Sequence, residues 1–290
     1  MVFTYDEGAR RRQVAVESLS VRHHAAEGLL RLLHALAVMK PKGDDAPSIW
    51  LAVADTPNSL ADTVNGVVNA MNADKNLLQS LYFRPDIPLG EPEAKAFETA
   101  LARINHANLL LTNAELPVNT ANNKVKHGLA VSARDDLRVE LITTAPDENG
   151  NIPVSAFDKG KSMPIFDRPL LSLLGRPPGR EKGVELTTVR IDVPSVLSEA
   201  WMFASVYSTI FHVRALKHFG SDELIAPYPA LPVGPAPAQI LTGRVEGLRT
   251  VVTTPADGSE GRQPGLFLYN TFIPMHIDYE TGVSGGVVAG

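Results

Sequence analysis

Residues 194–220, PSVLSEAWMFASVYSTIFHVRALKHFG, carry a strong helical pattern. Apolar side chains follow one another in steps of three or four along one face: Val196, Ala200, Phe203, Tyr207 and Ile210. The neighbouring faces are apolar too, at Leu197, Trp201, Ala204 and Phe211. Because a helix that is apolar on several sides is normally buried at the centre of a domain, this segment predicts a helical core.

Other segments favour helices that would pack against this one. Residues 14–39 and 58–72 repeat apolar side chains at helical spacing. A further helix is predicted for residues 92–111, which begin with a proline, and a shorter one for residues 118–127. Residues 49–56, IWLAVADT, suit either a strand or a helix. The side chains that we expect to be buried are Leu30, Leu33, Phe97, Ile104, Phe203, Tyr207 and Ile210.

Between residues 136 and 193 the helical period gives way to alternation. LRVELITT (137–144) and GVELTTVRIDV (183–193) alternate apolar and polar side chains, which is typical of strands with one buried face. Two segments between them, SMPIFDRP (162–169) and LLGRPPGREKG (173–183), are predicted as loops because they contain Pro and Gly.

These patterns predict an α+β fold. We expect a mainly α-helical bundle of four to five helices over residues 1–219, with a β-rich insertion at about 136–193. Residues 220–290 are rich in Pro and Gly and are predicted as a C-terminal extension, with two short strands within 243–254 and 265–279.

Composition narrows the class of protein. The chain has 290 residues and a formal net charge of −5, so its overall charge does not favour a polyanionic partner. It contains no cysteine, which excludes disulfides, thiolate metal sites and cysteine nucleophiles. No apolar run approaches the roughly 20 residues that span a bilayer. We therefore expect a soluble, cytoplasmic protein with no membrane partner.

The most compact polar cluster is NNKVKHG at residues 122–128. On a helix, Asn123 and His127 share one face and Asn122 and Lys126 share the next one. Such a group suits phosphate chemistry, because an imidazole moves a proton near neutral pH while lysine and amide side chains hold the phosphate.

A second interpretation of the same cluster is structural. Lys124, Lys126 and His127 fall in the last helical turn, where positive charge interacts favourably with the helix dipole. Gly128 would then end the helix in a left-handed conformation. The sequence leaves both interpretations open.

The stretch NKVKHG (123–128), preceded by helices and followed by a β-rich insertion and a long apolar helix, resembles HEPN-like helical bundle proteins. The resemblance covers residues 14–219. It implies metal-independent RNA cleavage in which His127 acts on the 2′-hydroxyl, Lys124 or Lys126 stabilises the phosphorane charge, and a homodimer completes the site.

This chain departs from the active members of that family at one point. They carry an arginine four to six residues before the histidine, and here those positions hold Asn123, Asn122 and Ala121. We therefore expect a weakly active or non-catalytic member that binds or processes RNA. If the protein is an enzyme, the resemblance implies an endoribonuclease.

The candidate site assigns His127, Lys124 and Asn123 to catalysis and Lys126 and Asn122 to phosphate binding. No ligand spacing indicates a metal site, and no cofactor is expected. The alternative function is a non-enzymatic scaffold, in which the protein contacts a protein partner.

Overall fold

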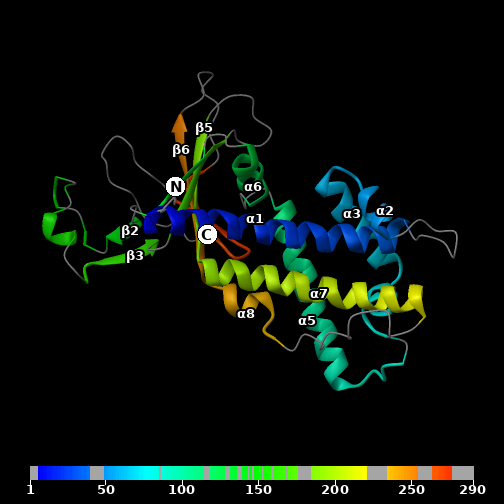
Figure 1. Cartoon of the computed structure of the whole chain (residues 1–290). Coiled ribbons are helices and arrows are strands. Elements are labelled where there is room, and N and C mark those ends of the chain that lie inside the picture. The colour runs from blue at the N-terminus through cyan, green and yellow to red at the C-terminus, as the bar shows by residue number, and fades with distance from the viewer. Residues whose placement is uncertain are drawn as a thin grey trace. The chain divides into compact units, whose positions relative to one another are not determined.

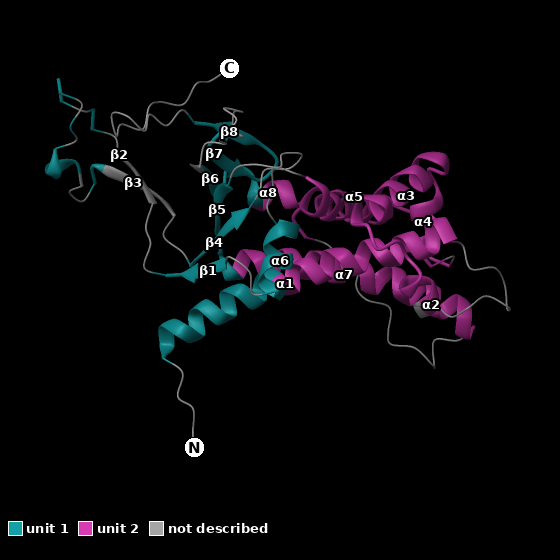
Figure 2. Cartoon of the chain, turned by 90° about the horizontal axis from the view of Figure 1, so that it is seen from above, with its two compact units in different colours: residues 1–19, 114–193, 241–290 teal, residues 20–113, 194–240 magenta. Residues whose placement is uncertain are grey.

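The computed structural model describes residues 6–39, 49–84, 86–113, 118–127, 131–135, 139–142, 144–145, 147–149, 151, 153–157, 160–166, 169–175, 184–220, 234–253 and 263–275. The fold is α+β with helix as the prevailing element, which confirms the predicted class (Figure 1). The chain divides into two compact units, coloured separately in Figure 2. We call residues 20–113 and 194–240 the helical unit, and residues 1–19, 114–193 and 241–290 the sheet unit.

The helical unit contains most of the predicted helices. Its elements are α1 (Glu7–His34, which starts in the sheet unit), a π-helical turn η1 (Ala35–Met39), α2 (Ile49–Ala54), α3 (Leu60–Ala73), α4 (Leu77–Tyr82), α5 (Glu91–Thr112), α7 (Val193–Phe219) and α8 (Pro237–Leu241). The ambiguous segment IWLAVADT forms α2 and is therefore a helix. Ser59 caps α3 by accepting a hydrogen bond from the backbone N–H of Asp62.

The core of the helical unit is close to the one that periodicity predicts. Leu30, Leu33, Ile104, Phe203 and Ile210 are each no more than 1% exposed. Phe97 and Tyr207 were also predicted to be buried, but the structure leaves both half-buried. Each fully buried side chain of this size contributes about 1.5–3 kcal/mol to stability.

The helix α7 is buried on one side only, so the prediction that it lies at the centre of a domain is wrong. Leu197 and Trp201 are 44% and 58% exposed. The inward side chain Glu199, on a different face of the helix, contacts both α1 and α5, and Arg103 of α5 reaches Trp201 without covering it. Apolar composition alone does not determine how many neighbours a helix has.

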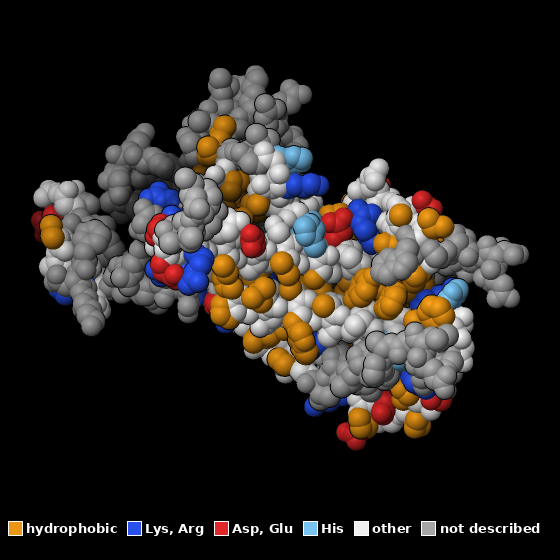
Figure 3. Space-filling model, viewed as in Figure 1, with side chains coloured by type: hydrophobic (Ala, Val, Ile, Leu, Met, Phe, Trp, Pro, Cys, Tyr) orange, Lys and Arg blue, Asp and Glu red, His pale blue; other side chains and the backbone are white. Residues whose placement is uncertain are grey.

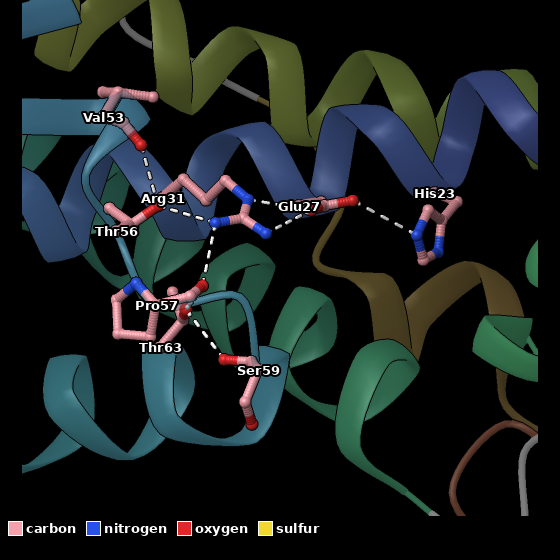
Figure 4. Close-up of polar contacts among 8 residues, drawn as sticks. All are labelled: His23, Glu27, Arg31, Val53, Thr56, Pro57, Ser59 and Thr63. Carbon is pink, nitrogen blue, oxygen red and sulfur yellow. Dashed lines mark hydrogen bonds and ion pairs between the residues drawn. The ribbon is translucent and has the colours of Figure 1, made fainter. Parts of the chain in front are cut away.

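A polar network joins α1 to the connection between α2 and α3 (Figure 4). Arg31 donates from Nε to Glu27 Oε1 at 2.8 Å, and from Nη1 to Thr56 Oγ1 at 2.6 Å. Its Nη1 also reaches the carbonyl oxygen of Pro57 at 3.0 Å. On the other side of Glu27, its Oε2 lies 3.3 Å from His23 Nε2.

This network predicts a particular acid sensitivity. The hydrogen bond from His23 and the contacts of Arg31 outweigh partial burial and lower the pKa of Glu27 from 4.5 to about 2. A carboxylate whose folded-state pKa is depressed adds stability above its unfolded pKa and loses it as the pH falls toward the folded value. The free energy of unfolding, measured with urea, should therefore fall less steeply between pH 4.5 and 2 in Glu27→Gln than in the unmodified protein.

A suitable control for this prediction is Glu17→Gln on the same helix, because Glu17 contacts the neutral amide of Gln13 at 2.7 Å. This control should keep the steep acid dependence. Equal slopes for Glu27→Gln and the unmodified protein would contradict the assignment.

The sheet unit is built on an antiparallel sheet in the order β1-β4-β5-β6-β7-β8. Its elements are α6 (Val118–His127), β1 (Val131–Arg134), β2 (Val139–Ile142), a 3₁₀ turn η2 (Val154–Phe157), β3 (Ser162–Phe166), β4 (Leu170–Gly175), β5 (Val184–Arg190), β6 (Val245–Thr253), β7 (Gly265–Leu268) and β8 (Phe272–Pro274). The sheet therefore uses strands from both sides of the boundary at residue 219 that the sequence predicts.

Two segments predicted as loops contain strands. Residues 162–166 form β3, which pairs with β2 in a separate two-stranded sheet, and residues 173–175 end β4. Pro164 is tolerated because both strands of a two-stranded sheet are edge strands, so no neighbour requires its missing N–H. Residues 176–183 of the second predicted loop lie outside the described residues.

Within the described ranges, no helix combines the length and the apolar character needed to cross a lipid bilayer.

Candidate functional site

The predicted polar cluster lies on α6 in the sheet unit. The inward face of this helix is formed by Val118, Ala121 and Asn122, which follow helical spacing and are all buried. The helix packs beside β1, and Lys124 approaches the end of β4, where its Cε would lie 3.9 Å from a methyl group placed on Gly175.

The five candidate residues do not share one surface. Asn123, Lys126 and His127 are exposed and Lys124 is half-buried. Asn122, predicted to hold phosphate beside Lys126, is only 7% exposed because it belongs to the face that packs inward. Asn123, Lys124, Lys126 and His127 thus all lie in the last turns of α6 with at least part of each side chain accessible, whereas Asn122 is buried.

Within the described ranges, the basic side chains at the end of α6 have no acidic partner. Among the described residues, no carboxylate forms an ion pair with Lys124, Lys126 or His127, and no hydrogen bond engages their side chains. Their position in the last turn is favourable for the helix dipole, as the structural interpretation expects. Gly128, the predicted helix stop, lies outside the described residues.

The arginine triplet at the start of α1 is a weaker phosphate candidate. Arg10 pairs with Glu7 at 2.8 Å, and Arg12 pairs with Asp135 at 2.9 Å. A pocket of about 330 Å³ beside the triplet is lined by Glu7, Arg10, Arg11, Val14, Pro169 and Val193. Because two of the three arginines are already neutralised, the α6 cations are the better phosphate ligands.

The helical unit contains a buried ionic cluster that sequence patterns did not reveal. Glu199 of α7 accepts a hydrogen bond from Arg22 Nη1 at 2.7 Å through Oε2, and its Oε1 lies 2.6 Å from His106 Nε2. These three side chains are at most 4% exposed. Burial favours the protonated carboxyl group, but the Arg22 charge and the His106 hydrogen bond outweigh it and lower the pKa of Glu199.

The contacts and the burial of this cluster indicate a structural role in the core of the helical unit. Both carboxylate oxygens of Glu199 have a partner inside the helical unit, and the three side chains are closed to solvent, so a substrate cannot reach them in this conformation. No local signal could have found it, since Arg22 and His106 lie 177 and 93 residues from Glu199 in the chain.

In the part of the chain that the structure describes, no group of three or more His, Asp or Glu side chains is arranged to hold a metal ion.

The α6 cluster can therefore offer charge and hydrogen-bond donors to a phosphate. Comparisons of the chain with protein-family models, with curated proteins and with solved structures find no match. A function for this protein therefore has to be inferred from the chemistry and the placement of its side chains.

Proposed function

We propose that this protein is a HEPN-like, non-catalytic RNA-binding protein that contacts phosphate groups through the end of α6. The observation that carries the proposal is the absence, within the described residues, of any counter-charge for Lys124, Lys126 and His127. Among the described residues, two lysines without a counter-charge in one helical turn give a local positive potential in a chain whose net charge is −5, and the His127 imidazole in the same turn adds a polar group. Phosphate neutralisation supplies most of the affinity in sequence-independent RNA binding.

Binding without cleavage agrees best with the surroundings of His127. A general base needs a positioned partner and a substrate held within hydrogen-bond distance. His127 is exposed, and the positions where active members of the family carry arginine hold Asn123, Asn122 and Ala121. The homodimer that the resemblance implies stays a prediction.

Replacing Lys124, Lys126 and His127 together with glutamine should weaken binding of a fluorescent single-stranded RNA at least about tenfold, because two or three phosphate contacts are lost. Losing both lysine contacts should also make the slope of log K against log salt concentration shallower by about 1.4. Fluorescence anisotropy at several salt concentrations measures both effects, and gel electrophoresis of the RNA should show no cleavage.

The matched control replaces Lys75, Lys95 and His24 with glutamine, which removes the same residue types from exposed positions outside α6. This control should bind RNA like the unmodified protein. If the unmodified protein binds no RNA, or if the α6 variant binds as well as it does, the proposal is wrong.

A second candidate function, a protein-interaction module, is favoured by the outer face of α7. Leu197 and Trp201 lie one turn apart and are 44% and 58% exposed. Figure 3 shows hydrophobic side chains gathered on the viewed surface along this helix. Exposed aromatic side chains are enriched at protein interfaces, so a negative result with RNA would leave this candidate standing.

A further inference from the structure

The helical unit contains a second buried arginine, Arg103 of α5, which has a different environment from Arg22. Its side chain is 0% exposed. Nη1 donates to Ser205 Oγ at 2.8 Å, and the guanidinium carbon lies 5.2 Å from the centre of the Trp201 ring. These contacts fix the plane of the guanidinium and use one of its three nitrogen atoms.

The other two nitrogen atoms, Nε and Nη2, have no hydrogen-bond partner among the described residues. Their N–H bonds run parallel on one edge of the guanidinium, and this edge binds the two oxygens of a carboxylate or phosphate at once. Arg84 of the same unit shows the arrangement, since its Nε and Nη2 each donate to one oxygen of Asp86 at 2.9 Å.

An unpaired buried charge is energetically unfavourable. Arginine stays protonated in proteins, so Arg103 keeps its positive charge despite being buried. Arg22, which is also buried, has the carboxylate of Glu199 as its partner. Within the described ranges, Arg103 has no carboxylate within ion-pair distance. Buried polar groups in native proteins are almost always satisfied by a protein group, a water or an ion, and the positive charge of this edge favours an anion as its partner.

We infer that the Nε–Nη2 edge of Arg103 is a binding site for an oxyanion, the carboxylate or phosphate group of a ligand. The two parallel donors would hold two of its oxygens, while Ser205 and Trp201 keep the guanidinium in place. The site is closed in this conformation, so binding requires a neighbouring side chain or segment to shift.

Gly234 borders the same edge. A methyl group built on its α-carbon would lie 2.8 Å from Arg103 Nη2, which is too close for the guanidinium to keep its position. The backbone of Gly234 is outside the left-handed region, so alanine is compatible with its conformation. The absence of a side chain at Gly234 therefore allows the guanidinium to keep its present position.

The test is thermal unfolding in sodium phosphate, in sodium acetate and in sodium chloride at equal ionic strength and pH. A ligand that binds only the folded state raises Tm with its concentration. We expect phosphate or acetate to raise the Tm of the unmodified protein above its value in chloride, and the responding salt identifies the group. Arg103→Met should lose this rise, and Arg103→Lys should weaken the fitted affinity at least about tenfold because lysine lacks the parallel donors.

Two controls separate this site from others. Arg84→Met removes an arginine whose two-donor edge is already occupied by Asp86, and it should keep the rise. The α6 triple variant should keep it as well, so failure here is distinguishable from failure of the proposed RNA-binding function. If Arg103→Met does not fold, Gly234→Ala decides, since it keeps the charge but should weaken the affinity at least about tenfold by displacing the guanidinium.

Two results would overturn the inference. One is a rise in Tm that persists unchanged in Arg103→Met, or in Gly234→Ala if only that variant folds. The other is the absence of any rise in the unmodified protein with either anion.

Discussion

Replacing Glu199 with alanine should lower the free energy of unfolding by about 3–5 kcal/mol, because it leaves the buried guanidinium of Arg22 without its counter-charge. Arg22 and Glu199 are 4% and 3% exposed, so water cannot replace the lost carboxylate without entering the core. His106 loses its partner in the same substitution, which adds a second unsatisfied group. Urea unfolding at neutral pH, followed by circular dichroism, measures the difference.

Two further variants distinguish a broken ion pair from a general loss of packing. Asp86→Ala removes a carboxylate that also pairs with an arginine, but at an exposed position, and should change stability little. The double variant Arg22→Met with Glu199→Leu removes both charges and should recover most of the lost stability. A loss in Glu199→Ala no larger than that in Asp86→Ala would show that the buried pair is not a major determinant of stability.

Replacing Phe203 with alanine should lower the free energy of unfolding by about 3–5 kcal/mol, because a fully buried aromatic side chain leaves a cavity that the helices cannot fill. Phe203 is 0% exposed, and its ring centre lies 5.6 Å from that of His106, so the cavity would open beside the ionic cluster. The same urea experiment measures this loss.

The matched control for Phe203 is the other aromatic ring on the same turn of α7. Trp201 is 58% exposed and contacts the Arg103 guanidinium through its face, so Trp201→Ala should cost only about 1 kcal/mol. Comparable losses in the two variants would mean that the outer face of α7 is covered in solution, which would contradict the exposure described here.

The sequence predicted secondary structure well where the pattern is local and long. The helix over residues 118–127 and the strand over 184–190 fall within predicted segments, and the helix over 60–73 ends one residue beyond the predicted 58–72. The strand at 162–166 was missed because Pro164 is read as a loop residue, and only its pairing with β2 shows that an edge position accommodates it.

The candidate site on α6 could be predicted only in part. Four-residue spacing placed Asn123 and His127 together, and both are exposed. Spacing could not show that Asn122 turns inward, because this depends on the contact between α6 and the sheet unit that surrounds it. Among the residues that the structure describes, Lys126 has no counter-charge, and this is likewise a property of the folded chain.

By itself, the sequence determined the long helices, the alternating strand at 184–190, and which side chains are apolar enough to form a core. These are properties of neighbouring residues, because the helical and strand periods repeat within a few positions. Tertiary structure alone decided that Phe203 is buried while Trp201 is exposed, that Glu199 pairs with Arg22 and His106, and that Arg103 keeps two donors free. Those outcomes depend on which helices pack together. Glu199 lies 93 positions from His106 and 177 from Arg22, so no local sequence pattern predicts their contact.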